Sequence, residues 1–346
     1  MAEGNGSYAS QLRQELCLRN RQHARGRAHV ESYGSAPVIV YAPEEGRHGN
    51  FLDAAYAAIV ERPEWARRFD KIHAQGRSLP MAERRWRELD SSMSSDALLM
   101  NVFCMPGVVE SEAVRRMLGV EADAAPVFGW MARVPLKNGR TDRTEVDMRL
   151  GGLLVEAKLT EADFLSRSAG ILEAYRDFDD VFERDLLPRV ALRTVRRKEA
   201  MEFPEEFSQE WEDVAVPDSE IDARTRIASA YHAEIVAKGI AQQPTEPGYA
   251  GYQLIRNVLA AHAHGCSFCL MHDARRPDLR EAWFQVMSAV KPAEMRVRLK
   301  AATWQELAAV LPAGLQAFLD WKYGIAAQPK MTSITRSGDG WNEGCP

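Results

Sequence analysis

The sequence lacks the features of a membrane-spanning, secreted or disulfide-linked protein. No apolar stretch approaches the ~20 residues of a membrane span, and the N-terminus has no apolar core like that of a signal peptide. The five cysteines are irregularly spaced, which fits a reducing compartment better than a disulfide framework. From these absences we expect a cytoplasmic protein that does not contact a membrane.

Motifs of several common enzyme classes are also missing. The chain has no Gly-x-x-x-x-Gly-Lys-Ser/Thr and no strand-linked Gly-x-Gly-x-x-Gly, so no nucleotide-binding loop is predicted. It has no Gly-x-Ser-x-Gly elbow of a serine hydrolase. The net charge of −5 argues against a strongly basic, non-specific coat for nucleic acids. A local basic groove would still be enough for binding nucleic acid.

The chain does contain a hairpin over residues 144–158. Both arms alternate polar and apolar residues, as half-buried strands do. Gly151-Gly152 between the arms suits a two-residue turn, which needs positive φ. Folding the arms about this turn sets Leu150 opposite Leu153 and therefore fixes the register of the whole hairpin.

In this register two carboxylates face each other. Asp147 lies opposite Glu156, and Glu145 lies opposite Lys158. Side chains in opposed positions are roughly 5 Å apart, and like charges at that distance destabilise a sheet. A divalent cation between Asp147 and Glu156 would explain the pairing, because Mg²⁺ prefers oxygen ligands. The alternative is an ordinary surface hairpin with charge pairs across its strands.

Asp147, followed after eight residues by Glu156-Ala157-Lys158, resembles the motif of the PD-(D/E)XK nucleases, the restriction-endonuclease-like superfamily. Val146 stands where many members have proline. Residues 94–103 and 252–257 resemble helices that flank the core in an uncharacterised bacterial branch of this superfamily. The resemblance covers roughly residues 85–325.

The resemblance implies metal-dependent hydrolysis of phosphodiester bonds, with Mg²⁺ or Mn²⁺ as cofactor. Asp147, Glu156 and the backbone carbonyl of Ala157 would hold the metal. Lys158 would orient or help deprotonate the attacking water and stabilise charge on the phosphate. Glu145 is a further candidate because of its place opposite Lys158.

The resemblance also points to residues outside the hairpin. The superfamily often has another acid on the helix before the sheet, for which Asp96 is the first candidate as a metal ligand, with Glu88 and Glu112 as rivals. Gln253 lies on a predicted helix over 249–264 that would border the site, where it could bond a metal-bound water or a phosphate. DNA rather than RNA is the expected substrate, and a homodimer is expected by analogy.

The order of predicted elements agrees with the resemblance. Strands over 126–135, 143–150 and 153–159 follow a helix that Ser95 would cap, and a helix over 161–183 comes next. Strands over 266–271 and 295–299 lie further along the chain. We predict an α/β fold with a restriction-endonuclease-like core, in which a mixed central sheet is flanked by helices. Residues 1–84 are predicted to be a mainly helical extension, 85–325 the nuclease-like domain, and 326–346 a disordered tail.

Two other functions stay open. The first is a nucleic-acid-binding or assembly protein that keeps the nuclease fold without activity. The second is a zinc-binding regulator, because a set of potential ligands falls within residues 262–272: His262, His264, Cys266, Cys269 and His272. However, 266–271 has the pattern of a buried strand, and residues three apart on a strand point to opposite faces. This pattern favours buried cysteines over a zinc site.

Overall fold

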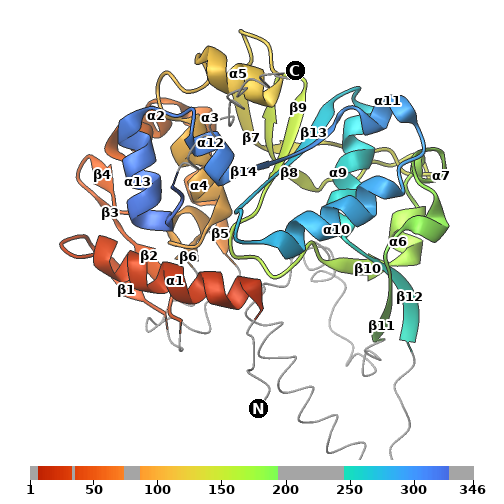
Figure 1. Ribbon diagram of the computed structural model, residues 1–346, viewed down its shortest axis with the longest axis horizontal. Coiled ribbons are helices and arrows are strands. Elements are labelled where there is room, and N and C mark those ends of the chain that lie inside the picture. The colour runs from red at the N-terminus through yellow and green to blue at the C-terminus, as the bar shows by residue number, and fades with distance from the viewer. Residues whose placement is uncertain (1–6, 33–35, 74–85, 194–244, 327–346) are drawn as a thin grey trace, which may run out of the picture.

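The computed structural model describes residues 7–32, 36–73, 86–193 and 245–326 of the chain (Figure 1). The disordered tail predicted for 326–346 lies outside these ranges except for Ala326. The fold is mixed α/β, as predicted: a central sheet carries helices on both faces, as in restriction-endonuclease-like folds. No helix among the described residues is both long and apolar enough to cross a bilayer.

The central sheet has five strands in the order β14-β13-β9-β8-β7. These strands are β7 (Pro126–Met131), β8 (Glu145–Leu150), β9 (Leu153–Ala157), β13 (Ser267–His272) and β14 (Leu299–Thr303). The first three form an antiparallel meander, and β13 pairs parallel with both β9 and β14. A parallel neighbour needs a crossover connection, which helix α9 (Tyr252–Ala263) provides between β9 and β13.

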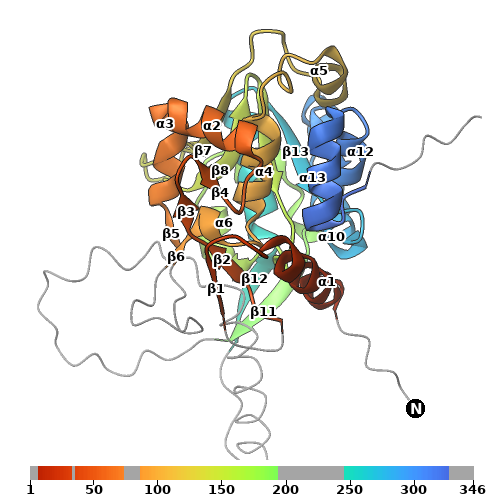
Figure 2. The ribbon, with the colours of Figure 1, turned by 90° about the vertical axis from the view of Figure 1, so that its left-hand side faces the viewer.

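Helices cover the two faces of the sheet as separate layers, each with its own apolar core. One layer holds α1 (Tyr8–His23), α2 (Asp53–Glu61), α3 (Pro63–Ala66), α4 (Ser95–Phe103), α5 (Glu112–Leu118), α12 (Trp304–Ala308) and α13 (Ala313–Tyr323). Figure 2 looks onto this layer, with α4 between α2 and α13. The other layer holds α6 (Ala169–Glu173), α7 (Phe178–Val181), α9, α10 (Pro277–Ser288) and α11 (Ala293–Arg296).

The first helices of the chain share the core of the central sheet. Leu16 of α1, Ile59 of α2 and Trp65 of α3 pack in the same cluster as Val155 and Met271 of the sheet. Short antiparallel pairs join these helices: β1 (His29–Glu31) with β2 (Ile39–Tyr41), β3 (Pro43–Glu44) with β4 (Arg47–His48), and β5 (Ile72–His73) with β6 (Trp86–Arg87). The domain boundary predicted at residue 84 falls within 74–85, outside the described residues.

The helix predicted over 161–183 is wrong. The chain instead forms β10 (Ser166–Ser168), α6 and α7, and β10 joins a second sheet with β12 (Thr245–Ala250) and β11 (Arg189–Arg193). The fully buried guanidinium of Arg276 donates to the carbonyls of Leu159, Glu161 and Ala162. These carbonyls are therefore not available as acceptors for a helix that starts here.

Two smaller predictions also need correction. The strand predicted over 295–299 begins only at Leu299, because α11 occupies 293–296. The cap of α4 is Ser94 rather than Ser95, since the Ser94 side chain accepts the N–H of Ala97.

The buried His23 at the end of α1 makes a testable contribution to pH-dependent stability. Its ring Nε2 lies 2.9 Å from the carbonyl oxygen of Gly49. Burial, followed by the positive charges of Lys322 and Arg27, lowers the pKa of His23 from 6.5 to about 3. As the pH drops below about 6.5, His23 therefore binds a proton in the unfolded chain but not in the folded chain. The free energy of unfolding consequently falls with the pH.

We expect His23→Gln to remove this loss. Between about pH 6 and pH 4, the free energy of unfolding of the wild type should fall by up to about 1.4 kcal/mol per pH unit more than that of the variant. Urea unfolding at several pH values measures the difference. Parallel curves for the two proteins would show that His23 does not carry the effect.

Candidate active site

The candidate site lies where strands β8 and β9 separate. Their ladder pairs Leu150 with Leu153, Arg149 with Leu154 and Met148 with Val155, which confirms the predicted register over this stretch, and then it ends. The N–H of Ala157 does not continue the ladder but donates to the carboxylate of Asp147, at 2.8 Å. Asp147 thus inserts its side chain between the two strands.

The direction of the β8 side chains changes at the same point. Met148 packs in the core on the α4 side of the sheet, whereas Val146, two residues earlier, packs in the core on the α9 side. Residues two apart on a regular strand share a face, so the backbone departs from a regular strand at Asp147. This distortion is what brings the carboxylate to the edge of β9.

Glu156 and Lys158 lie on the other side of the opening. Glu156 is 1% exposed, and its Oε1 lies 3.0 Å from the Nζ of Lys158. The ammonium of Lys158 also donates to Oε1 of Gln253 on α9, at 3.0 Å, and lies 5.7 Å from the centre of the Phe164 ring. The structure therefore brings together four of the residues named from the sequence: Asp147, Glu156, Lys158 and Gln253.

The electrostatics of the site oppose two adjacent negative charges. Burial, followed by the nearby carboxylates of Glu156 and Asp96, raises the pKa of Asp147 well above its ordinary value, although Lys158 and the Ala157 N–H act against this rise. Burial acts to lower the pKa of Lys158, but Glu156, Glu161 and Asp147 outweigh burial, and the pKa is raised. Lys158 is therefore a charged ammonium, and Asp147 is held in a place that disfavours its own charge.

Glu145 does not pair with Lys158, contrary to the sequence-based register. The β8–β9 ladder has already ended, and Glu145 pairs through its backbone with Met131 of β7. Its carboxylate instead accepts a bond from Arg68, at 2.9 Å, and lies 3.8 Å from Nζ of Lys71. Both cations come from the N-terminal part of the chain, Arg68 from the 3₁₀ helix Arg67–Asp70 and Lys71 directly after it.

Asp96 is engaged by the same two cations. Nη2 of Arg68 donates to its carboxylate, and Nζ of Lys71 lies 3.5 Å away. Burial acts to raise the pKa of Asp96, but Lys71 and Arg68 outweigh burial and lower it. Of the two rivals to Asp96, Glu88 joins this group through Lys71, at 2.9 Å, whereas Glu112 forms an exposed pair with Arg116 outside it.

Gly129 on β7 is required by this arrangement. Its φ of 61° lies in the left-handed region, which side chains other than glycine rarely adopt. A Cβ at this position would lie 2.0 Å from Nη1 of Arg68 and 3.1 Å from the Glu145 carboxylate. Because Gly129 has no side chain, the guanidinium of Arg68 has room to contact both Asp96 and Glu145.

The donors at the opening suit a hard divalent cation. Asp147, Glu156 and the carbonyl of Ala157 offer oxygen atoms, the donors that Mg²⁺ prefers, and the buried Oε1 of Glu156 has the Lys158 ammonium as its ion-pair partner at 3.0 Å. Among the described residues, no three His, Cys, Asp or Glu side chains lie together as a metal-binding cluster. Asp96 is an ion-pair partner of Arg68 and Lys71 in this structure.

Sequence reasoning missed several residues of the site. Asn257 donates from Nδ2 to Oε2 of Glu156, at 2.6 Å. It follows Gln253 by four residues on one helix, so helical spacing was an available signal. Glu161 accepts bonds from the Ser95 hydroxyl and the Leu159 N–H. Arg68 and Lys71 carried no local signal, because they lie far from the hairpin in sequence.

The zinc-binding alternative is not supported. Cys269 packs in the core on the α4 side of the sheet and Cys266 in the core on the α9 side, so the two thiols diverge as the strand pattern predicted. Both are free and buried. His264 instead bonds the carbonyl of Ala132, and the 262–272 segment contains no metal cluster.

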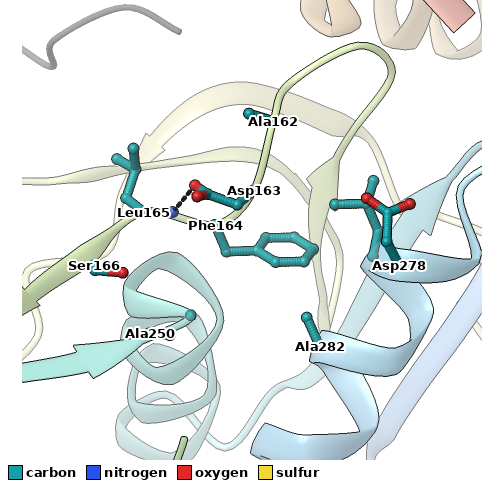
Figure 3. A pocket seen from close by; sticks show the side chains of 10 residues that line it. Ala162, Asp163, Phe164, Leu165, Ser166, Ala250, Asp278 and Ala282 are labelled. Atoms are coloured by element: carbon teal, nitrogen blue, oxygen red, sulfur yellow. Dashed lines mark hydrogen bonds between the residues drawn. The ribbon is translucent and has the colours of Figure 1, made fainter. Parts of the chain in front are cut away.

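A cavity of about 190 Å³ lies beside the site (Figure 3). Phe164 lines it together with Leu165, Leu279 and Ala282. The charged residues of its lining are Asp163 and Asp278, and no Lys or Arg lines it. Because its lining is apolar and acidic, this cavity does not suit a phosphate.

The charge of Asp147 should cost stability in the metal-free protein. A carboxyl whose pKa is raised by folding destabilises the folded state as the pH rises above its ordinary value of 3.8. We expect Asp147→Asn to raise the midpoint of thermal unfolding at pH 7.5, since the amide oxygen still accepts the Ala157 N–H. Differential scanning calorimetry in EDTA measures this midpoint.

Asp163→Asn is the matched control for this measurement. The exposed Asp163 also accepts a backbone N–H, from Leu165 at 2.7 Å, but it lies outside the group of acids at the opening. Its replacement should leave the midpoint unchanged or slightly lower. A lower midpoint for Asp147→Asn as well would contradict the predicted cost of the Asp147 charge.

Comparison with known proteins gives one family and no individual relative. No curated protein and no solved structure matches the chain. A family model matches residues 14–324, which include most of both helical layers, the site and the cations Arg68 and Lys71. The chain therefore belongs to the family described as "Restriction Endonuclease associating with ARP".

Proposed function

We propose that the protein is a metal-dependent nuclease of the PD-(D/E)XK type that hydrolyses phosphodiester bonds. One observation carries this proposal: Asp147, Glu156 and the charged Lys158 meet where β8 and β9 separate. The residues of the motif lie together at a distortion of the sheet, and the charge of Glu156 opposes that of Asp147. The restriction-endonuclease family of the chain supports a nuclease.

Asp147, Glu156 and the carbonyl of Ala157 would hold Mg²⁺ or Mn²⁺. When bound, the metal would acidify a water molecule and offset charge on the phosphate. The chain itself positions the acids: the Ala157 N–H fixes Asp147, and Asn257 fixes Glu156. A cation here would also offset the burial and the carboxylate repulsion that together raise the pKa of Asp147.

Lys158 supplies positive charge beside the scissile phosphate. Its raised pKa means that the amine carries its proton at neutral pH, so stabilisation of negative charge suits it better than removal of a proton from water. The side-chain oxygen Oε1 of Gln253 accepts a hydrogen bond from the Lys158 ammonium and keeps the ammonium next to Glu156. Gln253 is therefore a positioning residue for Lys158 in this proposal.

The substrate that we propose is DNA rather than RNA, with a role in restriction and defence or in repair. The family description names an association with ARP, and we extend this association to the chain as a proposed partner. A homodimer is part of the same proposal, by analogy with the superfamily.

The alternative is a nucleic-acid-binding or assembly protein that keeps the fold without activity. One observation favours it: Glu156 and Lys158 are only 1% and 5% exposed, and they are already paired with each other. Such a protein would bind nucleic acid equally well without either side chain. The two proposals therefore differ in what removal of Lys158 does.

Cleavage of plasmid and linear DNA by wild type and Lys158→Met tests the proposal. Methionine keeps most of the volume of the buried lysine but not its charge. With Mg²⁺ or Mn²⁺ we expect the variant to cut at least ~10²-fold more slowly, as for loss of one preorganised charge, and to bind DNA as well as wild type in EDTA. Gel analysis of cleavage and fluorescence anisotropy give the two quantities.

Lys137→Met is the matched control, because Lys137 is half-exposed and pairs with Asp179 outside the site. It should cut DNA at the wild-type rate. Equal cutting by wild type and Lys158→Met would refute the assigned role of Lys158. Complete inactivity of both on DNA and RNA, with intact binding, would favour the inactive binding protein.

A further inference from the structure

Asn257 gives Glu156 a partner that nothing in the motif predicts. The residue is fully buried on α9, and its Nδ2 donates to Oε2 of Glu156 at 2.6 Å. Oε1, the other oxygen of Glu156, lies toward Lys158. One oxygen is thus held by a neutral amide, and the other is left on the side of Lys158.

Arg256 fixes which end of the amide faces Glu156. Its Nη2 donates to Oδ1 of Asn257, at 2.7 Å, and to the backbone carbonyl of Glu145, at 2.6 Å. A guanidinium has only donors, so the oxygen of the Asn257 amide must turn toward Arg256. The NH₂ group must then face the carboxylate, which needs a donor.

The contacts of Asn257 differ from those of a structural buried amide. Asn101 on α4 is equally buried, and it bonds only backbone groups, those of Leu52, Asn50 and Ala97. The side chain of Asn257 instead bonds a carboxylate and a guanidinium. Hydrogen bonds to charged groups are shorter and roughly twice as strong as neutral ones, so Asn257 restrains Glu156 strongly.

We propose that Asn257 is a positioning residue for Glu156 as a metal ligand, and that Arg256 orients its amide. This inference rests on the proposed function, since it assigns a supporting contact to the same metal site. Partners that orient a metal ligand typically change metal affinity by about 10–100-fold. In this proposal Asn257 on α9 positions Glu156, and the N–H of Ala157 on β9 positions Asp147.

Titration of Mn²⁺ into the full chain tests the inference, with isothermal titration calorimetry as the readout. We expect Asn257→Ala to weaken Mn²⁺ binding by about 10–100-fold relative to wild type. The control Asn101→Ala loses an equally buried amide and should bind Mn²⁺ as wild type does, even though its unfolding midpoint falls. This comparison separates an effect on the metal from a general loss of stability.

A second readout separates positioning from catalysis. Cleavage by Asn257→Ala should return toward the wild-type rate as Mn²⁺ is raised, whereas cleavage by Lys158→Met should not. If circular dichroism shows that Asn257→Ala is unfolded, Asn257→Ser is measured in its place. Serine keeps a hydroxyl donor and leaves a smaller cavity than alanine does. This variant should fold and show a weaker but still measurable loss of Mn²⁺ affinity.

The outcomes separate the role of Asn257 from the existence of the metal site. Wild-type affinity in Asn257→Ala, or in Asn257→Ser where that variant replaces it, overturns the inference and leaves the metal site standing. A similar loss of affinity in Asn101→Ala also overturns the inference, because the effect would then be general. No binding of Mn²⁺ by wild type overturns both the proposed function and the inference.

Discussion

The repulsion between Asp147 and Glu156 is the constraint around which the surrounding contacts are arranged. Glu156 is buried and Asp147 is partly buried, so both carboxylates lose hydration that they would have in water. The N–H of Ala157 at the end of β9, the ammonium of the next residue, Lys158, and the Asn257 amide on α9 each offset part of that cost. Even so, the pKa of Asp147 stays well above its ordinary value. Strain of this kind is typical of sites that act on a ligand, because a fold selected for stability alone would not retain it.

A second charged group lies on the other side of the opening and connects the N-terminal part of the chain to the sheet. Arg68 and Lys71 neutralise Asp96 on α4 and Glu145 on β8. Because a buried acid without a partner is costly, α4 could not place Asp96 here if the preceding segment were absent. The N-terminal helices also complete the apolar core on this face of the sheet. Residues before the central sheet therefore share its apolar core and hold two acids beside the site.

Local patterns predicted the parts of the site that depend on local geometry. The Gly151-Gly152 turn and the alternation of its arms gave the register of Met148 to Leu150 correctly, and strand pattern separated Cys266 from Cys269. The register failed at Glu145, because the separation of β8 and β9 arises from the Asp147 side chain and is not visible as alternation. The helix predicted over 161–183 failed because Arg276, more than ninety residues later, takes its first carbonyls. Arg68 and Lys71 reach the site only through the tertiary fold.

Gly129 lies at the point where the N-terminal segment meets the central sheet. The space that it leaves open is filled by the guanidinium of Arg68, which crosses to Asp96 and Glu145. A side chain at Gly129 would be strained by the positive φ and would displace the guanidinium of Arg68 from this position. The contact between Gly129 and Arg68 is therefore a point at which the N-terminal segment and the central sheet depend on each other.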